Sequence, residues 1–126
     1  MSEKEKDWKS ILSHEEFHVT REKGTERPFS GKYNDFNEKG TYLCKCCGEE
    51  LFTSESKFNS GCGWPAFSSQ ITPEAVYKVR DLSHGMIREE ILCSNCDAHL
   101  GHVFDDGPAP THLRYCVNSI SLKFKK

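Results

Sequence analysis

The stretch AHLGHVFDDGPAPTHLRYCVNSISLKF, residues 98–124, decides the fold and the chemistry of this chain. It places His99 and His102 before a turn-forming run and Cys116 after it. No other cysteine lies within ten residues of Cys116 on either side. Because the thiolate is the attacking form of cysteine and nearby positive charge favours it, a thiol close to histidines and arginine is a candidate nucleophile.

The alternation of residues around Cys116 predicts a β-strand. Residues two apart on a strand point to the same side, so Arg114, Cys116 and Asn118 share one face, which we expect at the surface. The other face is apolar and carries Leu113, Tyr115 and Val117. We expect the guanidinium of Arg114 to lower the pKa of the Cys116 thiol.

The two histidines of the opening stretch are candidate proton donors, because histidine titrates near neutral pH. They are three residues apart, so a regular strand would point them to opposite faces. Either a turn at Gly101 brings both to the site, or only one of them is catalytic. His102 is the better candidate for direct contact with a substrate, and His99 is the second.

Four of the seven cysteines form two CxxC pairs, Cys44 with Cys47 and Cys93 with Cys96. Two such pairs supply four thiolates for a tetrahedral, structural zinc ion. Between the pairs lie 45 residues, whereas zinc ribbons usually separate them by roughly 15 to 20. The predicted zinc therefore closes a long loop. Cys46 could compete with Cys47 for the metal, but its CxC spacing is less usual.

Cys46, Cys62 and Cys116 remain outside the predicted zinc site. Glycines flank Cys62, and Trp64 follows, which predicts an exposed, tight loop that carries a thiol and an indole. A second thiol fits the oxidation of Cys116 to a sulfenic acid and its condensation with Cys62 to a disulfide. Such a disulfide needs an external dithiol reductant, such as thioredoxin. Cys46 stays open as another resolving thiol.

Length and composition limit the class of protein. The chain has 126 residues, a length that fits one domain over residues 1–126, and we expect residues 1–7 to be a flexible end. Its formal net charge is −2. The charge balance gives no attraction to nucleic acid or an anionic membrane. No apolar run approaches the roughly 20 residues of a membrane span, and the polar start lacks a signal peptide. We expect a soluble, cytoplasmic monomer.

The pattern of turns and short apolar runs predicts a mainly β protein with a helix near its start. Ser13 and Glu16 form a capping box, and Gly24 suits the end of the helix. A turn is expected at Ser83-His84-Gly85 and another at residues 105–108. Short strands are expected at residues 41–44, 50–53, 76–81, 86–93, 113–118 and 119–124.

Six motifs in register closely resemble the methionine-R-sulfoxide reductases, type B. They are GTERPFSGKY, CKCCG, FNSGCGWPAF, CSNC, HLGHVFDDGP and RYCVNSISLKF, and the resemblance covers about residues 8–124. It implies a β-tent of two antiparallel sheets with a short N-terminal helical segment and zinc-clamped CxxC knuckles. It also implies thioredoxin-dependent reduction of methionine-R-sulfoxide, free or in proteins.

The resemblance implies a role for each matching residue. Cys116 matches the nucleophile that attacks the sulfoxide sulfur, and Cys62 matches the resolving cysteine. His102 and His99 match the histidines that orient and protonate the sulfoxide oxygen. Trp64 matches the aromatic wall beside the substrate methyl group. The polar pocket residues are matched by Arg114 and Asn118, and the zinc ligands by Cys44, Cys47, Cys93 and Cys96.

Two other hypotheses use the same thiols. One is a zinc-stabilised binding module for a protein or nucleic acid, which would want a basic patch; the lysines at residues 123, 125 and 126 are too few for one. The other is a redox sensor in which a Cys62–Cys116 disulfide signals. Absence of multiple turnover with dithiothreitol would favour the sensor.

Overall fold

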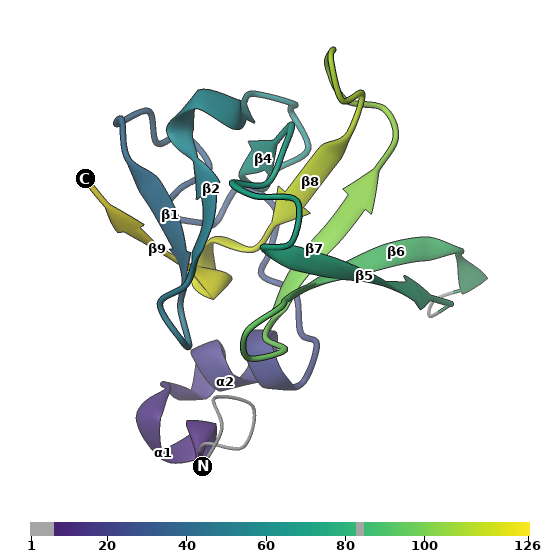
Figure 1. The fold of residues 1–126 in the computed structure, drawn as a ribbon. Coiled ribbons are helices and arrows are strands. Elements are labelled where there is room, and N and C mark those ends of the chain that lie inside the picture. Colours follow the sequence, from purple (N-terminus) through teal and green to yellow (C-terminus); the bar gives the residue numbers. More distant parts are fainter. Residues whose placement is uncertain (1–6, 83–84) are drawn as a thin grey trace.

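The computed structural model describes residues 7–82 and 85–126, which form two antiparallel sheets with helices at one end (Figure 1). The smaller sheet has the order β2-β1-β9 and the larger one β3-β4-β8-β7-β6-β5. The strands are β1 Thr41–Cys44, β2 Glu50–Thr53, β3 Lys57–Phe58, β4 Ala66–Phe67, β5 Val76–Asp81, β6 Arg88–Cys93, β7 His99–Phe104, β8 Arg114–Val117 and β9 Leu122–Lys125. The predicted two-sheet, mainly β architecture is confirmed.

The helices are α1 (Trp8–Ile11) and α2 (His14–Arg21), followed much later by the short 3₁₀ helices η2 (Ser54–Ser56) and η4 (Ser119–Ser121). Helix α2 begins with the predicted capping box, in which the N–H of Glu16 donates to Ser13 Oγ and the N–H of Ser13 donates to Glu16 Oε1.

Helix α2 ends at Arg21, three residues before Gly24. The left-handed residue that follows is Lys23, with φ of 60°, and not Gly24. A Cβ on Gly24 would collide with Cδ2 of His18, so the exposed ring of His18 would have to turn aside to admit one. The helix thus ends shortly before Gly24, as predicted, and the N–H of Gly24 donates to His18 O at 2.9 Å, but Lys23 adopts the left-handed conformation.

Several strands lie where the sequence predicts them. β1, β2 and β5 have the predicted bounds, and β6 begins two residues later than expected. The expected strand at 119–124 is wrong in its first half, because Ser121 N–H donates to Asn118 O (3.0 Å) and turns the chain into η4. β7 was not predicted, since both of its faces are largely buried and its sequence does not alternate.

Strand β8 lies inside the larger sheet, between β4 and β7. Cys116 is opposite Ala66 of β4 on one side and His102 of β7 on the other. The backbones of β7 and β8 approach so closely that a Cβ at Gly101 would collide with the carbonyl oxygen of Cys116. Glycine at this position therefore lets the two strands pair beside the cysteine.

A β-bulge in β7 decides how the two histidines point. Ile91 pairs with Gly101 but Leu92 pairs with His99, so one extra residue, Leu100, stands on the β7 side. His102 is opposite Glu90, and His99 is opposite Leu92. Since Glu90 and Leu92 are two apart on β6, both histidines lie on the same face of the sheet. The bulge, and not a turn at Gly101, brings them together.

The core between the sheets is aromatic. Phe52 of β2 stacks on Phe67 of β4 with ring centroids 4.4 Å apart, and Tyr42 of β1 meets Phe67 edge to face at 5.0 Å. All three side chains are fully buried. Full burial of such a side chain stabilises the fold by roughly 1.5–3 kcal/mol. These contacts fix the smaller sheet on the strand that pairs with β8.

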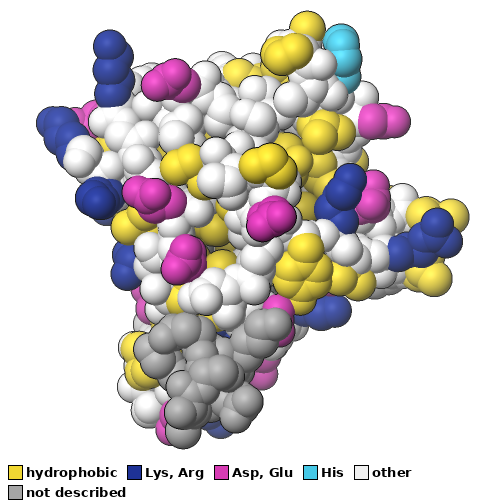
Figure 2. Space-filling model, viewed as in Figure 1, with side chains coloured by type: hydrophobic (Ala, Val, Ile, Leu, Met, Phe, Trp, Pro, Cys, Tyr) yellow, Lys and Arg dark blue, Asp and Glu magenta, His cyan; other side chains and the backbone are white. Residues whose placement is uncertain are grey.

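The expected flexible end at residues 1–7 and the expected turn at Ser83-His84-Gly85 fall largely outside the described residues. In the described ranges, no helix is both long and apolar enough to cross a membrane. Figure 2 shows acidic and basic side chains interspersed with hydrophobic ones, without an extended basic area among the described residues of this face. This face therefore gives no support to a nucleic-acid-binding module.

Candidate functional site

A small cavity of about 130 Å³ opens on the face of the larger sheet that carries the histidines. Its lining includes five of the residues that the sequence singled out, which come from β7, β8 and the adjoining loops. They are Trp64, His102, Arg114, Cys116 and Asn118, together with Thr25, Arg88, Gly101 and Phe104. His99 and Cys62 do not line the cavity but contact residues that do.

Cys116 lines the cavity. It is only 8% exposed, so the expected placement of Arg114, Cys116 and Asn118 on an open surface is wrong: they face a cavity. The Nη1 of Arg114 donates to Cys116 Sγ at 2.8 Å. The sulfur of Cys62 lies 3.0 Å from the sulfur of Cys116, and both cysteines are free thiols.

The pKa values of the two thiols are shifted in opposite directions. Burial, followed by the neighbouring Cys62 sulfur, raises the pKa of Cys116 to about 12, although Arg114 opposes this. Burial also works to raise the pKa of Cys62, but contacts with Cys116 and Ser60 and the charge of Arg114 outweigh it, so that pKa is lowered. Arg114 lowers the pKa of Cys116 as expected, but burial and the sulfur of Cys62 outweigh the guanidinium, so the net shift is upward.

The Cys62 loop adopts the backbone that its glycines predict. Gly61 and Gly63 have φ of 75° and 94°, a region that L side chains rarely occupy. Cys62 N–H donates to Ser60 Oγ at 3.2 Å and the residue is half-buried, so the loop is tight as expected but less open than an exposed loop. Two residues beyond Gly63, Pro65 O accepts from Val117 N–H (3.0 Å), which anchors the loop on β8.

Glu26, which the sequence did not single out, holds two walls of the cavity. Its carbonyl oxygen accepts from Trp64 Nε1 (3.0 Å), and its N–H donates to Asn118 Oδ1 (3.1 Å). The side chain is buried and accepts from Ile120 N–H at 2.9 Å, while burial raises its pKa. Its position in the turn-rich segment before residue 40 gave no sign of these long-range contacts.

Asp106 orients Arg114, and this pairing was also missed from the sequence. The carboxylate accepts from Nε at 2.7 Å and from Nη2 at 3.0 Å, and the guanidinium lies over the ring of Phe104, 4.4 Å from its centroid. The hydrogen bonding of Arg114 to Asp106 is the main cause that raises the pKa of Arg114. Arg114 therefore stays cationic and keeps one N–H group directed at Cys116.

His99 contacts a buried carboxylate, that of Glu90. Nδ1 of His99 lies 2.7 Å from Glu90 Oε2, and Lys23 Nζ lies 3.3 Å from the other oxygen, Oε1. His99 is 4% exposed and Glu90 is 2% exposed. Burial lowers the pKa of His99, and the hydrogen bond with Glu90 opposes this only in part. The contact directs Nδ1 of His99 away from the cavity.

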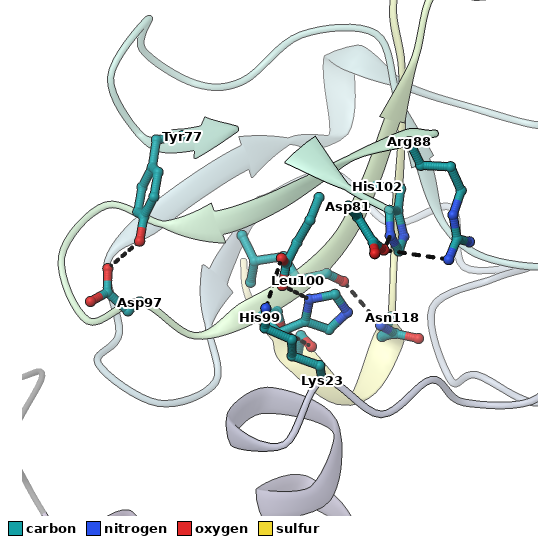
Figure 3. A network of polar contacts seen from close by, with 11 residues as sticks. Lys23, Tyr77, Asp81, Arg88, Asp97, His99, Leu100, His102 and Asn118 are labelled. Carbon is teal, nitrogen blue, oxygen red and sulfur yellow. Dashed lines mark hydrogen bonds and ion pairs between the residues drawn. The ribbon is translucent and has the colours of Figure 1, made fainter. Parts of the chain in front are cut away.

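His102 is held by a second carboxylate. Its Nε2 lies 2.8 Å from Asp81 Oδ2, which Arg88 Nη2 also contacts at 3.4 Å (Figure 3). The rings of His99 and His102 have centroids 5.8 Å apart. Each histidine thus has a separate carboxylate from β5 or β6, and only His102 lines the cavity. The sequence did not reveal these partners, because their placement depends on the register of three strands.

The two CxxC pairs meet where the sheets come together. Cys44 and Cys93 end β1 and β6, and each CxxC turn is followed by a left-handed residue. The N–H of Gly48 donates to Cys44 O (2.9 Å), and the N–H of Asp97 donates to Cys93 O (2.8 Å). The two knuckles therefore have the same backbone pattern on two different sheets.

The four sulfurs of these pairs are arranged as ligands of one metal ion. Those of Cys44, Cys47, Cys93 and Cys96 all lie within 4.8 Å of one another. The Cys44–Cys96 and Cys47–Cys93 sulfur separations are both 3.6 Å. Four thiolates around a tetrahedral ion with metal–sulfur bonds of about 2.3 Å would be separated by about 3.8 Å. The residues fit a metal, as predicted, and Cys46 lies outside the set of four.

Known proteins match this chain over nearly its whole length. The SelR domain model matches residues 12–126. A protein named peptide methionine sulfoxide reductase MsrB from Hahella chejuensis is 60% identical over 120 residues, which is 95% of this chain and 86% of that protein. A protein of the same name from Acinetobacter baylyi is 56% identical over 125 residues, or 99% of this chain and 90% of the relative.

The burial of His99 and its contact with Glu90 lead to a test by NMR titration. We expect the pKa of His99 to lie below its usual 6.5 and to fall further in Glu90→Gln, because the opposing carboxylate charge is lost. A folded pKa below the unfolded one means that protonation favours unfolding. The contribution of His99 to stability is therefore lost as the pH falls below about 6.5.

The matched control is Glu89→Gln, which removes an exposed carboxylate one residue away on the opposite face of β6. It should leave the titration of His99 unchanged. An unchanged pKa in Glu90→Gln, or an equal shift in both variants, would show that Glu90 does not control His99.

Proposed function

The chain belongs to the SelR domain family, and from this membership we propose that it is a peptide-methionine (R)-S-oxide reductase, which converts methionine-R-sulfoxide, free or in proteins, to methionine. The structural observation that carries the proposal is the cavity that Cys116 lines. There a cation, a second thiol and a histidine all lie beside or around one sulfur.

We assign substrate binding to the walls of this cavity. Trp64 and Phe104 offer apolar surface to the methyl group and the methylene chain of the sulfoxide, and Asn118 and Arg114 are the polar residues of the lining that would face its oxygen. The hydrogen bonds of Trp64 and Asn118 to the backbone of Glu26 hold these groups before the substrate arrives. Preformed donors of this kind stabilise developing charge without reorganisation.

His102 is the proposed proton donor to the sulfoxide oxygen, because it lines the cavity. Asp81 accepts from Nε2, which leaves Nδ1 as the ring nitrogen that the carboxylate does not engage. A carboxylate on one ring nitrogen stabilises the imidazolium that gives a proton from the other. His99, buried on Glu90, is placed to support His102 and does not reach the cavity itself.

Cys116 is the proposed nucleophile. Its thiolate attacks the sulfoxide sulfur, the oxygen is transferred to Cys116, and methionine leaves while Cys116 becomes a sulfenic acid. Cys62 Sγ raises the pKa of Cys116, and Arg114 lowers it. Movement of Cys62 away from Cys116, with Arg114 in place, would therefore favour the reactive thiolate.

Cys62 then resolves the sulfenic acid. Its thiol attacks Cys116 Sγ, a disulfide forms and the oxygen leaves as water. The two sulfurs are 3.0 Å apart, and a disulfide bond is about 2.05 Å long, so the bond needs only a small displacement of the Cys62 loop. A dithiol protein such as thioredoxin supplies the two electrons that restore both thiols.

The cysteine cluster is the proposed site of a structural zinc ion held by Cys44, Cys47, Cys93 and Cys96. A zinc ion bound by four thiolates has no open position and contributes to the free energy of folding. The cluster joins the β1–β2 turn of the smaller sheet to the β6–β7 turn of the larger sheet. Its role is to hold the two sheets around the site.

The remaining expectations enter as part of the proposal. We take residues 1–126 as one reductase domain that works as a monomer in the cytoplasm, without nucleic acid or membrane as a partner. Seven cysteines are many for a chain of 126 residues, and in a reducing compartment such usage is typical of metal binding or catalysis.

The proposed activity is tested with the separate R and S epimers of a blocked methionine sulfoxide and dithiothreitol. We expect methionine to form from the R epimer alone over many turnovers, since one cavity orients the methyl group and the oxygen. Cys116→Ser should lower the rate by at least about a thousandfold without loss of the fold. Equal rates for the two epimers, or no turnover of either, would contradict the proposal, and a single turnover would favour the redox sensor.

The role of Cys62 is tested by Cys62→Ser. We expect the variant to complete one turnover and then to lose thioredoxin-dependent turnover, because no disulfide can form. The pKa of Cys116, followed by thiolate absorbance, should fall, since serine removes the contribution of the second sulfur. Cys46→Ser is the control and should keep full turnover. The reverse pattern would make Cys46 the resolving cysteine.

The zinc proposal predicts that the purified protein contains one zinc ion per chain. Cys96→Ser should lose the metal and lower the free energy of unfolding by several kcal/mol, because metal binding is coupled to folding. Cys46→Ser, in the same knuckle sequence but outside the cluster, should keep both the metal and the stability. Loss of zinc from Cys46→Ser but not from Cys47→Ser would reassign the ligand set.

A further inference from the structure

The turn at residues 27–30 holds an aromatic side chain in a backbone conformation that suits glycine. Arg27 O accepts from Ser30 N–H at 3.2 Å, Pro28 takes the second position and Phe29 the third, with φ of 64°. A positive φ at the third position is typical of type II turns, which prefer glycine or asparagine there. A bulky residue in this region is an outlier, and such outliers gather at functional sites.

Packing does not account for this phenylalanine. Its side chain is 69% exposed, so contacts with the core offset little of the backbone strain at Phe29. Pro28 beside it is exposed as well. A strained residue that directs an aromatic ring to solvent is available for contact with another molecule, since aromatic side chains are common anchors of protein interfaces.

The turn packs on the loop of the proposed resolving cysteine. Phe29 N–H donates to Gly63 O at 2.6 Å, and Gly63 directly follows Cys62. A Cβ placed on Gly63 would lie 3.2 Å from Phe29 Cδ2 and 3.1 Å from Pro28 Cα. The exposed ring therefore lies against the backbone beside Cys62.

The position of the Phe29 ring indicates which molecule it could contact, the substrate or the reductant. The substrate sulfoxide reaches Cys116 through the cavity, whose lining includes neither Phe29 nor Cys62. A reductant must instead reach a sulfur of the disulfide. Cys62 is half-buried and Cys116 is 8% exposed, so Cys62 is the more accessible of the two. The ring is thus on the side from which a reductant approaches.

We propose that Phe29 is a docking contact for the dithiol protein that reduces the Cys62–Cys116 disulfide. The inference rests on the proposed function, which requires that disulfide in each cycle. The proposed partner has apolar surface beside its attacking thiolate. The exposed ring of Phe29 would contact that apolar surface, and the exposed side chain of Arg27 places a positive charge nearby.

The exchange that follows docking is balanced in two steps. The thiolate of the partner attacks Cys62 Sγ, the Cys62–Cys116 bond breaks, and Cys116 leaves as a thiolate beside Arg114 Nη1. The second thiol of the partner then attacks the partner's own sulfur in the mixed disulfide and releases Cys62 as a thiolate. The partner ends as a disulfide, having given two electrons.

The test compares the wild type with Phe29→Gly, a change that removes the ring and relieves the backbone strain. Both proteins are oxidised with one equivalent of hydrogen peroxide, and peptide mapping identifies the disulfide. The rate constant for reduction by thioredoxin, with thioredoxin reductase and NADPH, should be about tenfold lower in the variant. The rate with dithiothreitol should be unchanged, and the melting temperature should be no lower than that of the wild type.

Two variants serve as controls. Phe29→Tyr keeps a ring in the same place and should keep the rate with thioredoxin. Ile87→Ala removes another exposed apolar side chain, which is 78% exposed next to β6, and should have no effect. Together they show whether the slower reduction depends on a ring at residue 29 or follows from the loss of any exposed apolar side chain.

The proposal is overturned by an unchanged thioredoxin rate in Phe29→Gly, or by an equal loss with dithiothreitol. It is also overturned if no Cys62–Cys116 disulfide forms, or if Phe29→Gly slows only the use of oxidised polypeptides. The rate measurement contains no sulfoxide, so its outcome is independent of the epimer assay that tests the proposed function.

Discussion

The site depends on the pairing of β8 between β4 and β7. Cys116 is opposite Ala66 on one side and His102 on the other, and this one register sets the surroundings of the sulfur. The β4 pairing draws in the loop of Cys62 and Trp64, which precedes Ala66 directly. The β7 pairing draws in the histidines, and it is possible only because Gly101 has no side chain to collide with the Cys116 carbonyl.

The electrostatics of the site follow a common pattern, in which His99, His102 and Arg114 are each held by a different carboxylate. Glu90 serves His99, Asp81 serves His102, and Asp106 serves Arg114. The pair of Asp106 and Arg114 contributes little to stability, because Asp106 is 60% exposed and solvent screens the charges. Its importance lies in orientation, since two hydrogen bonds fix the guanidinium so that the third nitrogen faces Cys116.

Local patterns in the sequence predicted the parts of the fold that local interactions determine. The capping box of α2, the strands β1, β2 and β5, and the CxxC cluster follow from short-range spacing. The bulge at Leu100 could not be predicted, because it exists only in the register between β6 and β7. The same holds for Glu90, Asp81 and Glu26, whose partners are 9, 21 and 92 residues away. Sequence spacing gives the reactive residues, and tertiary pairing gives the groups that orient them.

The thiol pair shows why proximity alone does not make Cys116 reactive. Three influences act on its pKa: burial and the sulfur of Cys62 raise it, and Arg114 lowers it. Arg114 is fixed by Asp106, so its influence persists through the cycle, whereas the influence of Cys62 depends on the position of a loop. Movement of Cys62 away from Cys116 would leave Arg114 as the nearest charged partner of the sulfur. In the proposed cycle, the position of this loop would therefore set both the pKa of Cys116 and the availability of the resolving thiol.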